Sequence, residues 1–330
     1  MNIKVIYSSG GEFSAGGDKK VTDDETIKVA KKVVKALKGS GHLAKMMKIS
    51  PEKVKLINKI TADAVFNLCE WTGKDSHLGI EVLKRLEDQK IPYTGATSES
   101  DLLSCSKIAM KEMFDKYKIL TPNWVSVMPG EPKNKVYQKV NKLSFPIIIK
   151  PAFEHCGIGI GYNSVIRTKR GFTEEVMKAL SKFNEPVVVE EFIEGREFTT
   201  TIIKNHEVHV FPPAEVIFNT KNQNKILSFE TKWHQGKDSY GAKILEKNSL
   251  SENLKKKSKK IFNKLVKKGY VRIDFRVRNK NIYALEFNVN PSLLPEECYG
   301  LTASTEAAGW SFEKLVNEIA NSAATNDARN

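Results

Sequence analysis

Residues 271–289 (VRIDFRVRNKNIYALEFNV) constrain the fold of this chain more than any other segment, because apolar and polar side chains alternate on both sides of a short polar stretch. Successive strand side chains point to opposite faces, so the pattern predicts a β-hairpin with one apolar face. The apolar faces of the two strands lie on the same side of the hairpin only if the numbers of each pair of opposite residues add to an even value. A three-residue loop (NKN) gives such a pairing. This register places Asp274 opposite Glu286 and Arg272 opposite Asn288. On the second strand, the predicted apolar face consists of Tyr283, Leu285, Phe287 and Val289.

The polar face of this hairpin predicts a cation site. Two carboxylates directly across a strand pair repel each other, so Asp274 opposite Glu286 is unfavourable unless a cation lies between them. Together with the Asn288 side-chain carbonyl they form an all-oxygen ligand set, which suits magnesium or manganese. Taken alone, the hairpin is equally well explained as a surface ladder in which Arg272 and Arg276 neutralise the carboxylates.

Two lysines and a glycine-rich segment add chemistry suited to phosphate. Lys107 begins a predicted helix (107–118), and Lys150 ends the apolar strand 145–151 (FPIIIKP), where a buried ammonium group needs an anion. The following GIGIG segment can bring backbone N–H groups close to phosphate oxygens. The chain has no GxxxxGK[ST] motif and lacks the glycine spacing of a dinucleotide fingerprint, so we exclude a P-loop protein and a dinucleotide oxidoreductase.

The order of the remaining patterns predicts a mixed α/β chain. The first hundred residues alternate strands and helices, as in a small and mostly parallel α/β unit. The strands expected there are 4–7 and 62–68, and the helices are 23–37 and 78–89. Further along the chain we expect a helix at 173–183, a strand at 186–193, a long loop at 219–240 and a last helix near 312–319.

The composition narrows the location and the partners. No apolar run reaches the roughly 18–20 residues of a membrane span, the N-terminus does not resemble a secretory leader, and four scattered cysteines without a CxxC pair fit the reducing cytoplasm. The net charge of +14 comes from dispersed lysines, with eight arginines among 53 basic residues. Nucleic-acid-binding surfaces are usually clustered and contain arginine or stacking aromatics, so we expect neither a membrane nor a nucleic acid as partner.

Several segments, in chain order, resemble the ATP-grasp superfamily in its D-alanine–D-alanine ligase-like branch: VFNL, IPYTG, FPIIIKP, VVVEEFIEGREFT, SFETKW and RIDF with LEFNVNP. The resemblance implies an α/β fold whose C-terminal half is α+β. It places an N-terminal Rossmann-like (pre-ATP-grasp) unit at 1–103, a small central ATP-grasp lobe at 104–186, and a C-terminal lobe with the metal site at 187–330. The last two lobes would clasp ATP.

The same resemblance implies an ATP-dependent carboxylate–amine ligase that forms a peptide-type bond through an acyl phosphate. ATP and Mg²⁺ (or Mn²⁺) would be its cofactors, and a small-molecule carboxylate and an amine its substrates. A homodimer is also implied, since relatives generally dimerise. The alternative that we retain is a catalytically inactive ATP-binding sensor or partner protein of the same fold.

The resemblance assigns a role to each motif residue. The residues implied in nucleotide binding are Lys107, Lys150, Cys156, Gly157, Glu190, Glu191, Ile193 and Glu197. Those implied as metal ligands are Asp274, Glu286 and Asn288. Arg272 resembles the arginine that stabilises the oxyanion of the tetrahedral intermediate, and Lys232 resembles the phosphate-binding lysine of the family's flexible loop.

The chain departs from D-alanine–D-alanine ligases mainly around the substrate, although two substitutions lie in the phosphate flap. Glu12 does not align cleanly with the glutamate that holds the first substrate's amine, and Ser292 replaces a glycine after the NxNP motif. Cys156 and Gly157 also stand where the family has serines. We therefore expect a carboxylate–amine pair other than D-alanine with itself. Whether Glu12, Glu70 or His77 contacts the substrate is left open.

Overall fold

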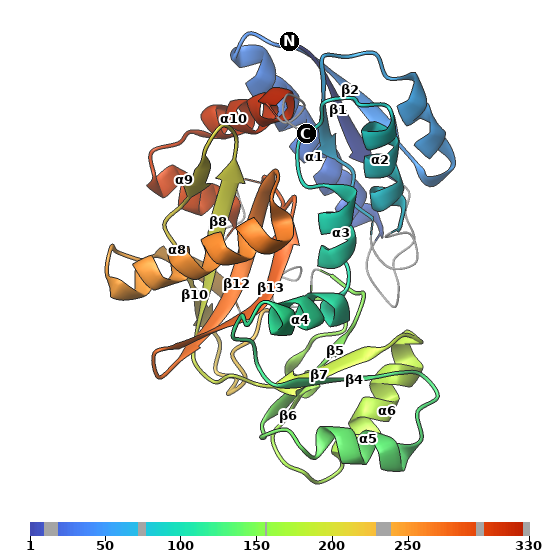
Figure 1. Ribbon diagram of the computed structural model, residues 1–330, viewed down its shortest axis with the longest axis vertical. Helices are drawn as coiled ribbons and strands as arrows, with labels where there is room; N and C mark the ends of the chain where they lie inside the picture. Colours follow the sequence, from blue (N-terminus) through green and yellow to red (C-terminus); the bar gives the residue numbers. More distant parts are fainter. Residues whose placement is uncertain (10–18, 72–76, 156, 229–238, 295–299, 326–330) are drawn as a thin grey trace.

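The computed structural model describes residues 1–9, 19–71, 77–155, 157–228, 239–294 and 300–325 (Figure 1). Its strands form three separate sheets. Within those ranges, no helix combines the length and the apolar character that a membrane crossing requires.

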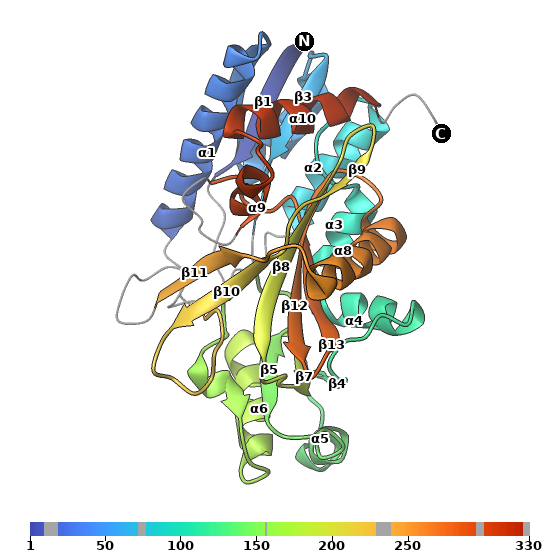
Figure 2. The same ribbon diagram turned by 90° about the vertical axis from the view of Figure 1, so that its left-hand side faces the viewer.

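The N-terminal sheet is parallel, with strand order β2-β1-β3. Its elements are β1 (Asn2–Ser8), α1 (Lys19–Gly39), β2 (Leu43–Ile49), a 3₁₀ helix (Pro51–Lys59), β3 (Ala64–Leu68) and α2 (His77–Asp88). The C-terminal helix α10 (Phe312–Thr325) packs against α1 and β3, which both views show (Figures 1 and 2). The predicted parallel α/β unit is therefore completed by the far end of the chain.

The central sheet is antiparallel, with strand order β4-β7-β5-β6. Its elements are β4 (Trp124–Val127), α5 (Lys133–Val140), β5 (Ile147–Pro151), β6 (Val165–Ile166), α6 (Phe172–Phe183) and β7 (Val187–Glu191). Val136, Val176 and Leu180 of the two helices pack into one apolar core with the sheet. Because β7 pairs with β4 and β5, we propose that the central unit ends after Glu191 rather than after residue 186.

The C-terminal sheet follows the order β11-β10-β8-β12-β13, with β9 paired to β8. Its strands are β8 (Arg196–Lys204), β9 (Val208–Val210), β10 (Ala214–Asn219), β11 (Ser239–Ile244), β12 (Tyr270–Arg278) and β13 (Asn281–Val289). The helices α3 (Ser98–Ser104), α4 (Lys107–Lys116), α8 (Ser249–Ile261) and α9 (Leu301–Ala307) complete this region. Met110 and Phe114 of α4 join Leu254 and Ile261 of α8 in the core against β12 and β13. One face of the sheet is thereby covered. The predicted loop 219–240 lies partly outside the described residues, and its part at 220–228 contains no helix or strand.

The hairpin of β12 and β13 has the predicted pairing at its functional end and a different turn. Arg272 pairs with Asn288 and Asp274 with Glu286, as expected. The predicted three-residue loop at 279–281 is wrong, because the turn has only two residues, Asn279 (φ 49°) and Lys280 (φ 70°). Two successive positive φ angles are typical of a type I′ turn, which follows the twist of the strands.

A β-bulge reconciles the short turn with the predicted pairing. The register shifts after Asp274, so Phe275 pairs with Ala284 and Leu285 is the extra residue. As a result Ile282 and Ala284 lie in the buried core beside Phe287, although we predicted them on the polar face. The bulge also brings Leu285 into the wall of the cavity described below.

The N-terminal unit and the C-terminal lobe meet backbone to backbone at Gly95 and Gly269. A Cβ atom on Gly269 (φ +77°) would lie 2.3 Å from the Gly95 carbonyl carbon, and one on Gly95 (φ +98°) would lie 2.2 Å from Asn290 Oδ1. The same Asn290 oxygen accepts a hydrogen bond from the Ala96 N–H at 3.0 Å. Only glycine fits at these two positions, which fixes how the two units approach each other.

Candidate active site

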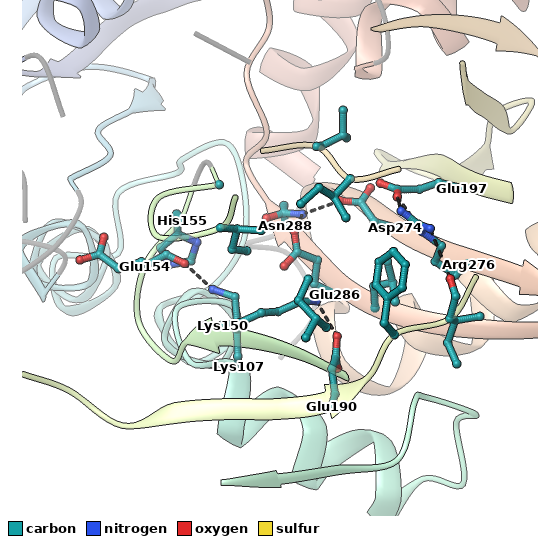
Figure 3. Close-up of a pocket in the computed structure, with 18 of the residues that line it drawn as sticks. Lys107, Lys150, Glu154, His155, Glu190, Glu197, Asp274, Arg276, Glu286 and Asn288 are labelled. Carbon is teal, nitrogen blue, oxygen red and sulfur yellow. Dashed lines mark hydrogen bonds and ion pairs between the residues drawn. The ribbon is translucent and has the colours of Figure 1, made fainter. Parts of the chain in front are cut away.

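A cavity of about 830 Å³, including its open mouth, lies between the central and C-terminal sheets (Figure 3). Most of the residues predicted to form the site line this cavity: Lys107, Lys150, Gly157, Glu190, Glu191, Ile193, Glu197, Asp274, Glu286 and Asn288. The sequence motifs therefore meet in one place. Cys156 and Lys232 lie outside the described residues.

Asp274 is the centre of the predicted metal site and is only 7% exposed. Arg272 binds it with two parallel hydrogen bonds, Nε to Oδ1 at 2.9 Å and Nη2 to Oδ2 at 3.0 Å. The Asn288 Nδ2 group donates to Asp274 Oδ2 at 3.1 Å and lies 3.5 Å from Glu286 Oε1. All four side chains thus gather at the functional end of the hairpin.

The electrostatics of this cluster fit a divalent cation. Burial raises the pKa of the Asp274 carboxyl, and the neighbouring Glu286 carboxylate adds to the rise against the lowering effect of Arg272. Two close carboxylates are the hard oxygen donors that Mg²⁺ prefers, and the Asn288 carbonyl would join them once its Nδ2 group turned away from the carboxylates. Asp274, Glu286 and Asn288 therefore fit the group that the fold family implies.

Glu190 holds the lysine side of the cavity together. Its carboxylate is 1% exposed and lies 2.5 Å from Lys150 Nζ and 2.5 Å from Lys111 Nζ. Burial alone would raise the pKa of Glu190, but the two ammonium groups outweigh it and lower the pKa. Our sequence reasoning did not single out Lys111, although its spacing of four from Lys107 on a helix places both on one face. The assignment of Glu190, Glu191 and Ile193 to nucleotide binding stays a prediction.

The three lysines differ in how their surroundings act on them. Burial lowers the pKa of Lys107 and of Lys111. Burial also opposes the charge of Lys150, but the Glu190 and Glu286 carboxylates outweigh it and raise its pKa. Lys150 and Lys111 each contact Glu190 at 2.5 Å, and the Glu286 carboxylate raises the pKa of both. Lys150 is thus the lysine held most firmly in its charged form.

The opposite end of the cavity is apolar. Its wall includes side chains from five separate segments, namely Ile148, Ile160, Phe192, Ile226 and Leu285. Such a wall suits a flat apolar group, while the charged end suits an anion. Sequence patterns do not predict Ile226 and Leu285 in this wall, because Ile226 lies in a segment without helix or strand and the position of Leu285 depends on the bulge.

A family model described as "D-ala D-ala ligase C-terminus" matches residues 113–321. The chain belongs to this family. The D-alanine–D-alanine ligase of Aquifex aeolicus is 29% identical over 96% of this chain and 99% of its own length. The ligase of Pelagibacter ubique is 28% identical over 99% of this chain and all of its own. The predicted family, and with it the class of ATP-dependent ligases that form C–N bonds, is confirmed.

Solved structures confirm the fold. The D-alanine–D-alanine ligase of Bacillus anthracis complexed with ATP superposes with a TM-score of 0.74 at 22% identity and covers 98% of this chain and 97% of its own. The VanG D-Ala:D-Ser ligase of Enterococcus faecalis superposes with a TM-score of 0.77 at 16% identity, covering 98% of this chain and 100% of its own. The predicted ATP-grasp fold is therefore confirmed.

Proposed function

We propose that this protein uses ATP and Mg²⁺ to join a small-molecule carboxylate to an amine. One observation carries the proposal: a single cavity is lined by apolar side chains, by the two half-buried lysines Lys107 and Lys150, and by a cluster of two carboxylates with an amide. The confirmed family supports it, as do relatives named for D-alanine ligation and a family structure solved with ATP. We also propose a cytoplasmic location and leave the homodimer as a prediction.

The proposed reaction has two chemical steps, and different residues of the site would act in each. A substrate carboxylate oxygen attacks the γ-phosphorus of ATP and the bond to ADP breaks, giving an acyl phosphate. The amine nitrogen then attacks the acyl carbon, loses a proton, and phosphate leaves. Lys107 and Lys150 would neutralise the phosphate oxygens during the first step. Bound Mg²⁺ would supply further charge neutralisation at the phosphates, held by Asp274, Glu286 and Asn288.

Arg272, which contacts Asp274 but is not among the residues that line the cavity, would act in the second step. Its guanidinium is fixed by Asp274 at 2.9 Å and 3.0 Å, so it needs no reorganisation when negative charge develops on the acyl oxygen. A preorganised donor of this kind typically contributes about 10²–10³-fold to the rate.

The test is an ADP-release assay with Mg²⁺ and pairs drawn from D-alanine, L-amino acids and simple dicarboxylates. We expect release to require both substrates, and to fall by about 10²-fold or more in Asp274→Asn and Glu286→Gln. Glu175→Gln, in an exposed helix pair with Lys178, is the matched control and should keep full activity. Release with D-alanine alone would overturn the predicted change of substrate. Nucleotide binding without turnover for any pair would favour the inactive sensor.

A further inference from the structure

Arg276 is a buried cation of the nucleotide cavity for which the proposed reaction has no direct use. It lies on β12, two residues beyond Asp274 and on the same face of the strand, and it is 4% exposed. An isolated buried charge is strongly unfavourable, so the partners of Arg276 show what this residue is built to hold.

Its first partner is Glu197, directly across the strand pair on β8. Arg276 Nε donates to Glu197 Oε2 at 2.8 Å, and Nη2 lies 2.6 Å from the same oxygen (Figure 3). Both contacts go to Oε2, and within the described part of the chain no residue donates to Oε1. The carboxylate therefore has a fixed orientation with one oxygen left for a hydroxyl group in the cavity.

The other two partners are main-chain carbonyls that frame the apolar end. Arg276 Nη1 donates to Ile193 O at 3.3 Å, just after β7, and Nη2 also donates to Lys225 O. Ile193 lines the cavity, as does Ile226, the residue after Lys225. One guanidinium therefore ties together β8, the segment after β7 and the segment 220–228.

Aromatic rings hold the guanidinium itself in place. Its central carbon lies 5.1 Å from the Phe192 ring centre and 5.8 Å from that of Phe218. Such contacts favour the flat guanidinium over a lysine ammonium, which could not keep all three partners at once.

We propose that Arg276 is a positioning residue for the ribose end of the nucleotide: it orients Glu197 to accept the sugar hydroxyls and holds the segment 220–228 against the base. This inference rests on the proposed function, because it assumes that an adenine nucleotide occupies the cavity. It assigns to Arg276 a contribution to recognition of the sugar, acting through Glu197 rather than by its own contact.

The test compares binding of ATP with that of 2′-deoxyATP and 3′-deoxyATP, measured by titration calorimetry with Mg²⁺ present. A hydroxyl donating to a charged, oriented carboxylate should give the wild type about a tenfold preference for ATP. In Arg276→Met we expect ATP to bind about tenfold more weakly and the preference to shrink to within about twofold. The KM for ATP should rise, while kcat at saturating ATP should change by less than about threefold.

Arg196→Met is the matched control. Arg196 also binds a glutamate through Nε and Nη2, at 2.7 Å and 2.6 Å, but its partner Glu215 is elsewhere on the sheet and Arg196 is exposed. This variant should keep both the ATP affinity and the sugar preference.

Each outcome decides between the two claims. If the wild type binds no adenine nucleotide, the proposed function fails. If it binds ATP but folded Arg276→Met keeps the wild-type sugar preference, or the wild type has none, the inference alone is overturned. If Arg276→Met does not fold, Arg276→Lys replaces it in the test, because lysine keeps the charge but not the paired donors. If Arg276→Lys then prefers ATP over the deoxy nucleotides as strongly as the wild type does, the inference is refuted.

Discussion

The charge of the buried Glu190 can be tested apart from its size, because glutamine has almost the same shape but no negative charge. Glu190→Gln keeps the size of the side chain but removes the negative charge between Lys111 and Lys150, each 2.5 Å away. Both lysines would then lose their nearest counter-charge in a largely buried setting. We expect the free energy of unfolding to fall by about 3–5 kcal/mol, the usual cost of breaking a buried ion pair by removing one partner.

The pH dependence follows from the lowered pKa of Glu190. A carboxyl whose pKa is lower in the folded than in the unfolded state stabilises the protein above its ordinary value of 4.5, and this stabilisation is lost as pH falls through the folded value. The difference between wild type and Glu190→Gln should therefore be largest near neutral pH and should shrink below pH 4.5.

Urea unfolding followed by circular dichroism measures both quantities. Glu175→Gln, which breaks an exposed pair at 2.7 Å, should cost less than about 1 kcal/mol and serves as the control. The double variant Glu190→Gln with Lys111→Met removes one of the two uncompensated charges and should recover part of the loss. A loss in Glu190→Gln no larger than in the control would refute the reasoning.

Three further predictions concern the site. Arg272→Lys should lower turnover by about 10²-fold while ATP binding persists, because lysine cannot reproduce the paired donors; steady-state kinetics would show otherwise if KM alone changed. Gly159→Ala should lower the free energy of unfolding by more than Gly171→Ala does. Both glycines have φ +75°, so alanine costs about 1–2 kcal/mol of backbone strain at either position. Only at Gly159 would the added Cβ also lie 2.6 Å from the Phe183 ring. Leu285→Ala should weaken ADP binding by about tenfold in titrations without metal. Unchanged ADP binding would show that Leu285 does not contact the nucleotide.

The hairpin shows how far sequence patterns reach. Alternation predicted the pairing of Asp274 with Glu286, because the two apolar faces of the hairpin lie together only in a limited set of registers. The bulge escaped prediction because Ile282, Ala284 and Leu285 are all apolar, so either face was acceptable for each. Only the core packing of the folded chain decides which one leaves the ladder.

The lysine side shows a different limit. Lys107 and Lys150 could be predicted from their places at the ends of elements and from the family motifs. The role of Lys111 could be recognised only in the folded structure, because Lys111 is on α4 and its partner Glu190 is on β7 of the central sheet, far along the chain. The strand β2 (LAKMMKI) was likewise missed, since it lies at a sheet edge and carries two lysines.

The glycine contact between Gly95 and Gly269 bears on attempts to graft a new acceptor specificity onto this enzyme. A chimera that imports another N-terminal unit must bring a residue without a side chain to the Gly95 position, and the host must keep Gly269. Alanine at position 95 or at position 269 would keep the transplanted unit away from the end of the hairpin, where Asn290 accepts a hydrogen bond from Ala96. Splice sites for such hybrids are therefore best chosen outside residues 95–96 and 269–290.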